Sequence, residues 1–206
     1  TGVVKRVRKP FMEFLEQLLD PKTGVKWELL WSSLAALNAG VRYALASFIA
    51  LDLVLFAQHN SNGLLNLIEP PGWASLLLGV VWLDFVSYAT HRLSHAVPIF
   101  WRIHRLNYSD PDVDLSTSRR HHPLETFIAT PILALGFLVS GAPPLSLLVW
   151  GALFGVLSVI QHGNICLPAA FDRCLRLILV TPNMHRIHHS STVDETDSNF
   201  SQLFPW

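Results

Sequence analysis

The sequence predicts an all-α integral membrane protein with about four transmembrane helices, two of them a short hairpin, capped by a cytosolic histidine-rich helical region. Half of its 206 residues are hydrophobic and only 15% are charged, and its mean hydropathy is +0.36. Long apolar runs alternate with polar segments that hold most of the lysine and arginine. Soluble domains of this size carry more charge and lack such runs.

The N-terminal segment, 1–25, combines a basic arm with an amphipathic stretch. The arm begins at Val3 with VVKRVRK, and FMEFLEQLL from Phe11 places its apolar side chains on one helical stripe. This pattern is typical of a helix lying in the membrane surface near lipid headgroups, and an ordinary packed amphipathic helix is the alternative. Pro21 and Gly24 end the helix in both cases.

Two apolar runs predict the first two crossings. The first covers 36–57, which is long enough for a bilayer core of roughly 30 Å. It contains Arg42, whose charge either reaches back to the headgroups or faces other helices. The second covers 73–88 and contains Asp84 near its end.

The apolar stretch 124–160 predicts two further crossings. As a single helix it would be about 55 Å long, far longer than a bilayer core is thick. A turn with Gly141 and two prolines interrupts it at 140–144. We therefore expect a hairpin of two short crossings, 126–140 and 145–160.

The distribution of positive charge assigns the sides of the membrane. The loop 58–72 and the hairpin turn contain neither lysine nor arginine, whereas the N-terminal arm and the regions 89–125 and 161–206 contain most of them. Positive loops favour the cytoplasmic side. Both termini and both histidine-rich regions are therefore predicted to be cytoplasmic, within a single membrane-embedded domain over 1–206.

Composition excludes several other classes of protein and site. The net charge is zero, which gives no reason to expect a nucleic-acid partner. Cys166 and Cys174 show neither metal-ligand spacing nor a disulfide framework, so both are expected to be free thiols. The chain starts at Thr1 and stops at Trp206 after a hydrophobic run, and we expect it to be part of a longer protein.

The densest histidine motif is NMHRIHHS, in which His185, His188 and His189 have the spacing i, i+3, i+4. On a helix this spacing puts all three imidazoles on one face. Neutral imidazole is the commonest protein ligand for transition metals, so the motif indicates part of a metal site. A solvated basic helix with incidental histidines is the alternative interpretation.

Other histidines gather on the same predicted side, and only His59 lies on the opposite side, which excludes it from a shared site. His91 and His95 are four residues apart, and Asp84 lies seven residues before His91, where it is expected to orient an imidazole. Taken singly, each histidine is also explained as a packing or surface residue. Together they outnumber the ligands of one ion, which favours two ions. The motifs contain no cysteine, so an iron–sulfur cluster is not expected. A site made of imidazoles suits iron, zinc, copper or nickel.

Five motifs occur in order between 84 and 200: HRLSH, WRIHRLNYSD, RRHHPLE, QHGN, and NMHRIHHS followed by TDSNF. They resemble the fatty acid hydroxylase and sterol desaturase superfamily of integral-membrane, histidine-box, non-haem di-iron enzymes. The resemblance implies O₂-dependent hydroxylation or desaturation of a membrane lipid, such as a sterol, a fatty acyl group or a related alkyl chain. It implies two iron ions, with O₂ as co-substrate.

The resemblance also implies roles for individual residues. No catalytic side chain is expected beyond the metal-bound oxidant. No haem, flavin or nicotinamide motif is visible, so electrons are expected from an external reductase with a cytochrome b5 or ferredoxin-like carrier. Asp84, Glu125 and Asn199 are the residues expected to contact the ligands and orient them. The ligand candidates are His91, His95, His104, His122, His162, His185, His188 and His189, with His121 and Tyr108 as possible additions.

The middle motif departs from the family. Its usual form is His-x-x-His-His, but after His104 this chain has Asn107 and Tyr108 at the last two positions. The loss puts one iron in doubt and leaves a catalytically degenerate, lipid-binding relative as an alternative. A histidine-rich metal carrier is a third possibility, although it would need ligands along a transmembrane path and no histidine lies near a midplane.

Overall fold

A computed structural model describes residues 63–109, 113–115 and 117–206, together with eight isolated positions between 33 and 56. The predicted arm and surface helix, 1–25, lie outside the described residues, as does His59. The predicted crossing 36–57 also lies outside them, apart from isolated positions. Every regular element in the described part of the chain is a helix, which confirms the all-α prediction.

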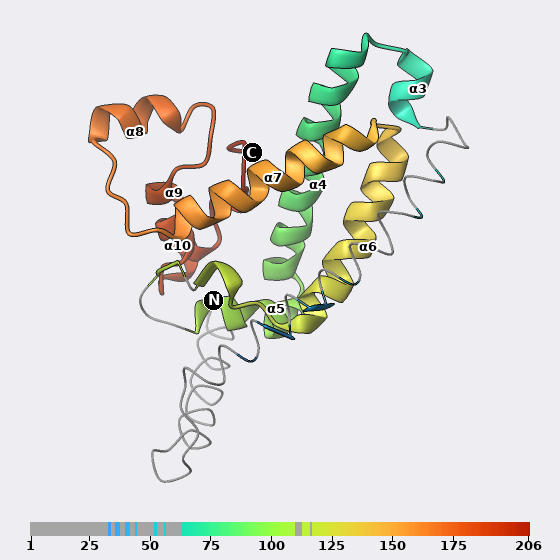
Figure 1. Cartoon of the computed structure of the whole chain (residues 1–206). Helices are drawn as coiled ribbons and strands as arrows, with labels where there is room; N and C mark the ends of the chain where they lie inside the picture. Colours follow the sequence, from blue (N-terminus) through green and yellow to red (C-terminus); the bar gives the residue numbers. More distant parts are fainter. Residues whose placement is uncertain are drawn as a thin grey trace.

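Three long helices form the body of the described structure, and α6 runs antiparallel to α4 and α7 (Figure 1). The long helices are α4 (Gly72–Ala96), α6 (Pro123–Ser140) and α7 (Pro144–His162). The short elements around them are α3 (Leu64–Ile68), α5 (Pro98–His104), η2 (Arg105–Tyr108), η3 (Thr117–Arg119), α8 (Ala169–Leu175), α9 (Pro182–His188) and α10 (Val193–Thr196).

The three long helices are long and apolar enough to cross a membrane. With 25, 18 and 19 residues they are about 27 to 37 Å long, close to the thickness of a bilayer core. They contain the predicted crossings 73–88, 126–140 and 145–160. Apolar side chains on their outer faces are exposed, for example Leu135 at 62% and Leu148 at 70%, as a lipid-facing surface requires. The chain is an integral membrane protein.

Helix α4 extends beyond the predicted crossing as far as Ala96. Neither proline nor glycine occurs between Gly79 and Pro98, so nothing in the sequence stops the helix earlier. The extension holds His91 and His95 one turn apart on a rigid element.

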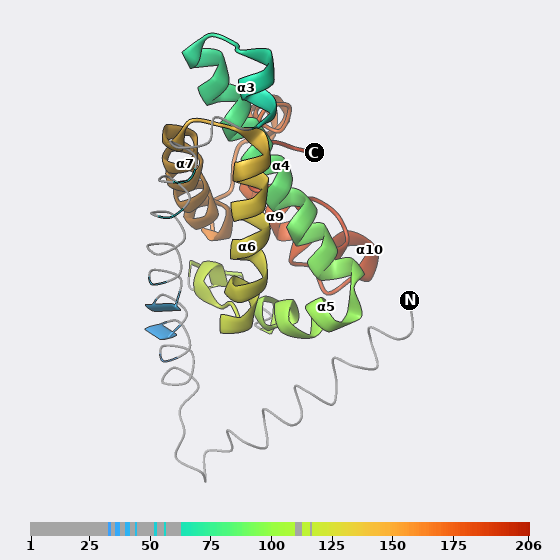
Figure 2. The same cartoon turned by 90° about the vertical axis from the view of Figure 1, so that its right-hand side faces the viewer.

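A tight turn joins α6 to α7, as predicted (Figure 2). Gly141 ends α6 in the left-handed region at φ 65°, a conformation that glycine adopts without strain. Pro144 occupies the first turn of α7, where its missing N–H costs no hydrogen bond.

Helix α4 packs against both helices of this hairpin. A Cβ atom at Gly79 would lie 2.5 Å from the Ser146 hydroxyl oxygen, so glycine permits the close approach of α4 and α7. Trp82 Nε1 donates a hydrogen bond to the Gly136 carbonyl at 2.8 Å and joins α4 to α6. The buried apolar core consists of Val80, Leu83, Phe137, Ala142, Trp150 and Leu203.

The segment 198–206 returns to α4, where Asp84 binds it. This fully buried carboxylate accepts hydrogen bonds from Leu203 N at 3.2 Å, Phe204 N at 3.0 Å and Trp206 Nε1 at 2.9 Å. The expectation that Asp84 orients an imidazole therefore needs correction. Seven helical residues separate it from His91 by about 10 Å along the axis, which is beyond the reach of an aspartate.

Candidate metal centre

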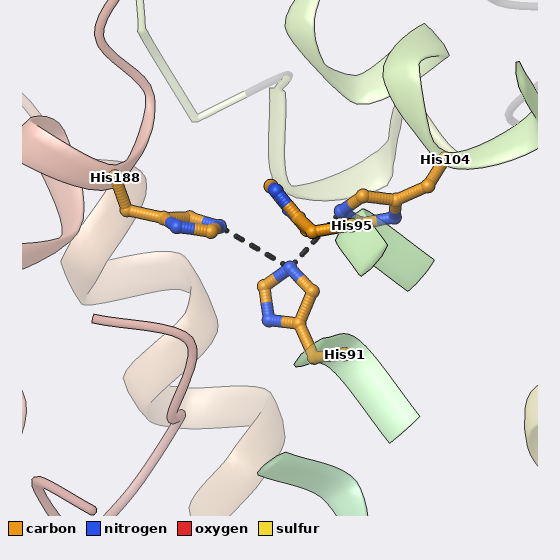
Figure 3. Close-up of side chains that lie close together, drawn as sticks. All are labelled: His91, His95, His104 and His188. Carbon is orange, nitrogen blue, oxygen red and sulfur yellow. Dashed lines mark hydrogen bonds between the residues drawn. The ribbon is translucent and has the colours of Figure 1, made fainter. Parts of the chain in front are cut away.

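Four histidines from three helices converge at one end of the long-helix bundle (Figure 3). Helix α4 supplies His91 and His95, α5 ends at His104, and α9 ends at His188. One ring nitrogen of each lies within 4.8 Å of the others. His91 Nε2 is 3.0 Å from His104 Nε2 and 3.2 Å from His188 Nε2. We call these four residues the first group.

Backbone carbonyls orient two imidazoles of the first group. His91 Nδ1 donates to the Phe200 carbonyl at 2.6 Å, and His188 Nδ1 donates to the Ser198 carbonyl at 2.7 Å. A carbonyl can only accept, so each Nδ1 carries the proton and each neutral ring presents a lone pair at Nε2. The segment anchored by Asp84 thus sets the tautomers of two candidate ligands.

Carboxylates orient the other two imidazoles. His104 Nδ1 donates to Glu125 at 2.9 Å, and His95 Nδ1 donates to Asp197 at 3.1 Å. Glu125 was expected near the histidines, whereas Asp197 was missed, although it belongs to the TDSNF motif. The Nε2 atoms of His91, His104 and His188 therefore lie close together on the side of the rings away from these acceptors, where a bound cation would accept their lone pairs.

Asn199 acts through its backbone. It lies between Ser198 and Phe200, whose carbonyls accept the hydrogen bonds from the imidazoles, and has φ 51°, in the left-handed region that asparagine tolerates better than most residues. This conformation allows the carbonyls of Ser198 and Phe200 to reach different imidazoles. The Asn199 side chain donates a hydrogen bond to Ser198 Oγ at 3.0 Å.

A second group combines His162, at the end of α7, with His185 and His189. His185 Nε2 lies 3.1 Å from His162 Nε2 and 3.2 Å from His189 Nε2. The Ser158 carbonyl accepts a hydrogen bond from His162 Nδ1 at 2.7 Å. The donor set therefore presents three imidazole nitrogens, which fits a transition-metal ion with open positions for other ligands.

The motif NMHRIHHS is shared between the two groups. His188 belongs to the first group, and His185 and His189 belong to the second. The ring centroid of His188 lies 5.6 Å from that of His185 and 5.5 Å from that of His189. The i, i+3, i+4 face thus borders two adjacent candidate sites instead of forming one side of a single site.

His121 and His122 have different environments. His121 Nδ1 donates to the second oxygen of Glu125 at 3.1 Å, so this carboxylate bridges His104 and His121. His122 accepts a hydrogen bond from Leu124 N at 3.1 Å and caps the N-terminus of α6. His104, His121 and Glu125 form a third set of possible ligands, and His122 belongs to none of the three sets among the described residues.

The two unusual residues of the middle motif are both buried. The Tyr108 hydroxyl lies 3.1 Å from His95 Nε2 and contacts His188 Nε2, while its ring stacks on His189 with centroids 4.7 Å apart. Asn107 Oδ1 has no hydrogen-bond partner. Tyr108, a possible additional ligand by sequence, therefore contacts residues of both groups.

Burial keeps the imidazoles of NMHRIHHS neutral. Desolvation, followed by the neighbouring histidines, holds the pKa of His185 and of His188 well below the usual 6.5. The same causes lower the pKa of His189 to about 2. Neutral imidazole is the form that binds metal ions, so these side chains are ready to act as ligands at physiological pH.

Comparisons with known proteins agree with the motifs. The fatty acid hydroxylase family model matches residues 76–206. Ornithine lipid hydroxylase OlsE of Rhizobium tropici is 30% identical over 128 residues, covering 62% of this chain and 38% of that protein. Alkylglycerol monooxygenase of Homo sapiens is 31% identical over 178 residues, covering 82% of this chain and 37% of that protein. The alkylglycerol monooxygenase of Xenopus tropicalis is 27% identical over 176 residues, covering 82% of this chain and 37% of that protein.

The chain spans less than two fifths of the length of these relatives. No solved structure matches it significantly. The family match covers more than half of the chain and includes every histidine of both groups. The chain belongs to the fatty acid hydroxylase family.

Proposed function

We propose that the protein is a membrane-bound oxidoreductase that uses two iron ions and O₂ to hydroxylate or desaturate an alkyl chain of a membrane lipid. One observation carries the proposal. One ring nitrogen of each of the four histidines lies within 4.8 Å of the others, and each Nδ1 contacts a carbonyl or carboxylate oxygen, which leaves Nε2 as the metal-binding atom. Imidazoles oriented at Nδ1 by an acceptor, with Nε2 turned towards one another, are the usual arrangement around a bound metal ion.

In this proposal each histidine group holds one iron. Asn107 and Tyr108 stand where the family has two further histidines, so iron occupancy is the quantity to measure. Bound iron would supply the reduction of O₂ and the oxidation of a C–H bond. The residues of the chain hold the imidazoles in place and surround them with aromatic rings. Trp101 and Phe200 each lie 4.9 Å from His95 between ring centroids, which limits the access of water.

The proposed substrate is a lipid that reaches the centre from the bilayer. Two relatives are named for hydroxylation of an ornithine lipid and for monooxygenation of alkylglycerols, and we extend the shared class, a membrane lipid, to this chain. The exposed apolar faces of α4, α6 and α7 lead towards the end where the histidines lie. We assign that end to the cytoplasmic side, where an external reductase and its carrier protein would deliver electrons.

The test is metal and product analysis of protein purified anaerobically in detergent. We expect close to two irons per chain after loading with ferrous salt, and an oxidised lipid when O₂, reductant and lipid extract are added. Combined replacement of His91 and His188 by alanine should remove iron from the first group and abolish the product. His122→Asn is the matched control, because asparagine keeps the helix cap and the residue lies outside both groups. Absence of iron from the parent protein would overturn the proposal.

A second candidate function is lipid binding without oxidation. The replacement of two family histidines by Asn107 and Tyr108 favours it. Retention of a co-purified lipid by protein that binds fewer than two irons and forms no product would select this function over the enzyme.

A further inference from the structure

Tyr108 places an oxygen among the nitrogen atoms of the first group. Its hydroxyl lies 3.1 Å from His95 Nε2 and in close contact with His188 Nε2. Two donors that each lie about 2.1 Å from one metal ion, at angles between square and tetrahedral, are about 3.0 to 3.4 Å apart. The spacings of His91 from His104 and His188 are 3.0 and 3.2 Å, and that of Tyr108 from His95 falls in the same range, whereas Tyr108 and His188 lie closer, at hydrogen-bond distance, and a shared ion would move them apart.

The charge at the first group calls for an anion. Four neutral imidazoles bring no negative charge to a buried metal ion. Glu125 and Asp197 contact the Nδ1 atoms of His104 and His95, on the side of each ring away from Nε2. Tyr108, which is 4% exposed, can supply a negative charge at donor distance if its phenol loses a proton. A trivalent ion in a desolvated site gains most from such a ligand.

We infer that Tyr108 is a phenolate ligand of the iron held by the first group when that iron is ferric, an inference that rests on the proposed function. Ferrous iron gives one electron to an external oxidant, the O–H bond of Tyr108 breaks, an iron–oxygen bond forms and the proton passes to the buffer. Tyrosine oxygen is an established ligand of ferric haem iron. The first group then has four nitrogen donors and one anionic oxygen, whereas the second group has three nitrogen donors.

The phenolate also distinguishes the two irons in redox behaviour. An anionic ligand stabilises the ferric state relative to the ferrous state, so the first iron should be harder to reduce than an iron bound by imidazoles alone. Tyr108→Phe removes the oxygen but keeps the ring that stacks on His189. It should therefore shift the reduction potential of the first iron to a more positive value.

Optical and resonance Raman spectroscopy of the iron-loaded protein test the inference. Protein loaded anaerobically with ferrous salt and oxidised with ferricyanide, then freed of that reagent, should show a visible phenolate-to-iron charge-transfer band with ring modes of tyrosine in the Raman spectrum. Tyr108→Phe should abolish the band while the protein retains iron, because four imidazoles remain. Tyr88→Phe is the matched control, since Tyr88 contacts Arg92 at 2.9 Å and not a histidine, and it should keep the band.

Each outcome decides a different point. A colourless ferric parent protein with iron bound, or an unchanged band in Tyr108→Phe, overturns the phenolate and leaves the histidine sites intact. Failure of the parent protein to bind iron overturns the proposed function as well. If Tyr108→Phe fails to fold, persistence of the tyrosine modes in both Tyr43→Phe and Tyr88→Phe assigns them to Tyr108, because the chain has three tyrosines.

Discussion

Asp84 accepts a hydrogen bond from Trp206 Nε1 at 2.9 Å, across 122 positions of sequence. This contact fixes the segment whose carbonyl groups orient His91 and His188. A buried carboxylate within a membrane helix is costly unless it is fully hydrogen bonded. Asp84 therefore links the stability of the fold to the geometry of the candidate metal centre.

Replacement of Asp84 by alanine should lower both the stability of the fold and the iron affinity of the metal centre. Two backbone N–H groups and the indole would lose their acceptor, at a cost of about 3 kcal/mol in the free energy of unfolding. The orienting carbonyls would also lose their anchor, so iron content should fall. Thermal unfolding and iron analysis in detergent measure the two effects. Ser75→Ala, at the start of the same helix, is the control, and equal iron content in both variants would contradict the link.

Substitutions at Asn199 separate a backbone role from a side-chain role. Asn199→Ala should cost about 1 kcal/mol, because alanine resists the left-handed conformation at φ 51°. Asn199→Gly should keep iron affinity, because glycine adopts this conformation freely. Titration with a competing chelator measures the affinities. The opposite order would mean that the asparagine side chain itself supports the site.

Glu125→Gln should lower iron affinity by about 10- to 100-fold, the usual effect of removing a carboxylate that orients a metal-binding histidine. Glutamine keeps the size of the side chain but loses the charge that holds His104 and His121. The same competition assay applies, with His122→Asn as the control on the adjoining helix cap. Wild-type affinity in Glu125→Gln would show that His104 needs no charged partner.

Acidification should destabilise the metal-free protein. The folded-state pKa values of His185, His188 and His189 lie below 6.5, so the unfolded chain takes up protons that the folded chain refuses. These residues contribute no pH dependence well above 6.5, and stability falls progressively as the pH drops below it. Thermal unfolding between pH 8 and pH 5 should show this decline. A rise in stability on acidification would contradict neutral buried imidazoles.

Restoring the family motif should increase iron content and lipid oxidation. The double replacement Asn107→His with Tyr108→His returns two imidazoles to positions beside the histidine groups, and it should also remove the charge-transfer band of ferric Tyr108. Iron per chain and oxidised lipid are the measurements, compared with each single replacement. Unchanged values would mean that the missing histidines do not limit the site.

The sequence predicted the helices well because their signals are local. Apolar length predicted α4, α6 and α7, and Gly141 with Pro143 predicted the hairpin turn. Helix α4 continues past the predicted crossing 73–88 as far as Ala96, because the crossing covers only the apolar part of the helix. Nothing there interrupts the backbone hydrogen bonds before Pro98.

The sequence by itself determined that the chain is a membrane protein rich in histidine motifs, because hydropathy and ligand spacing are properties of neighbouring residues. Only the tertiary structure decided how the histidines divide, placing His188 in one group and His185 in the other. It also decided that Asp84 hydrogen-bonds to the segment 198–206 and that Tyr108 lies between the two histidine groups. The acceptors that orient His91 and His188 are backbone carbonyls, which every residue possesses, so no residue type in the sequence could reveal them.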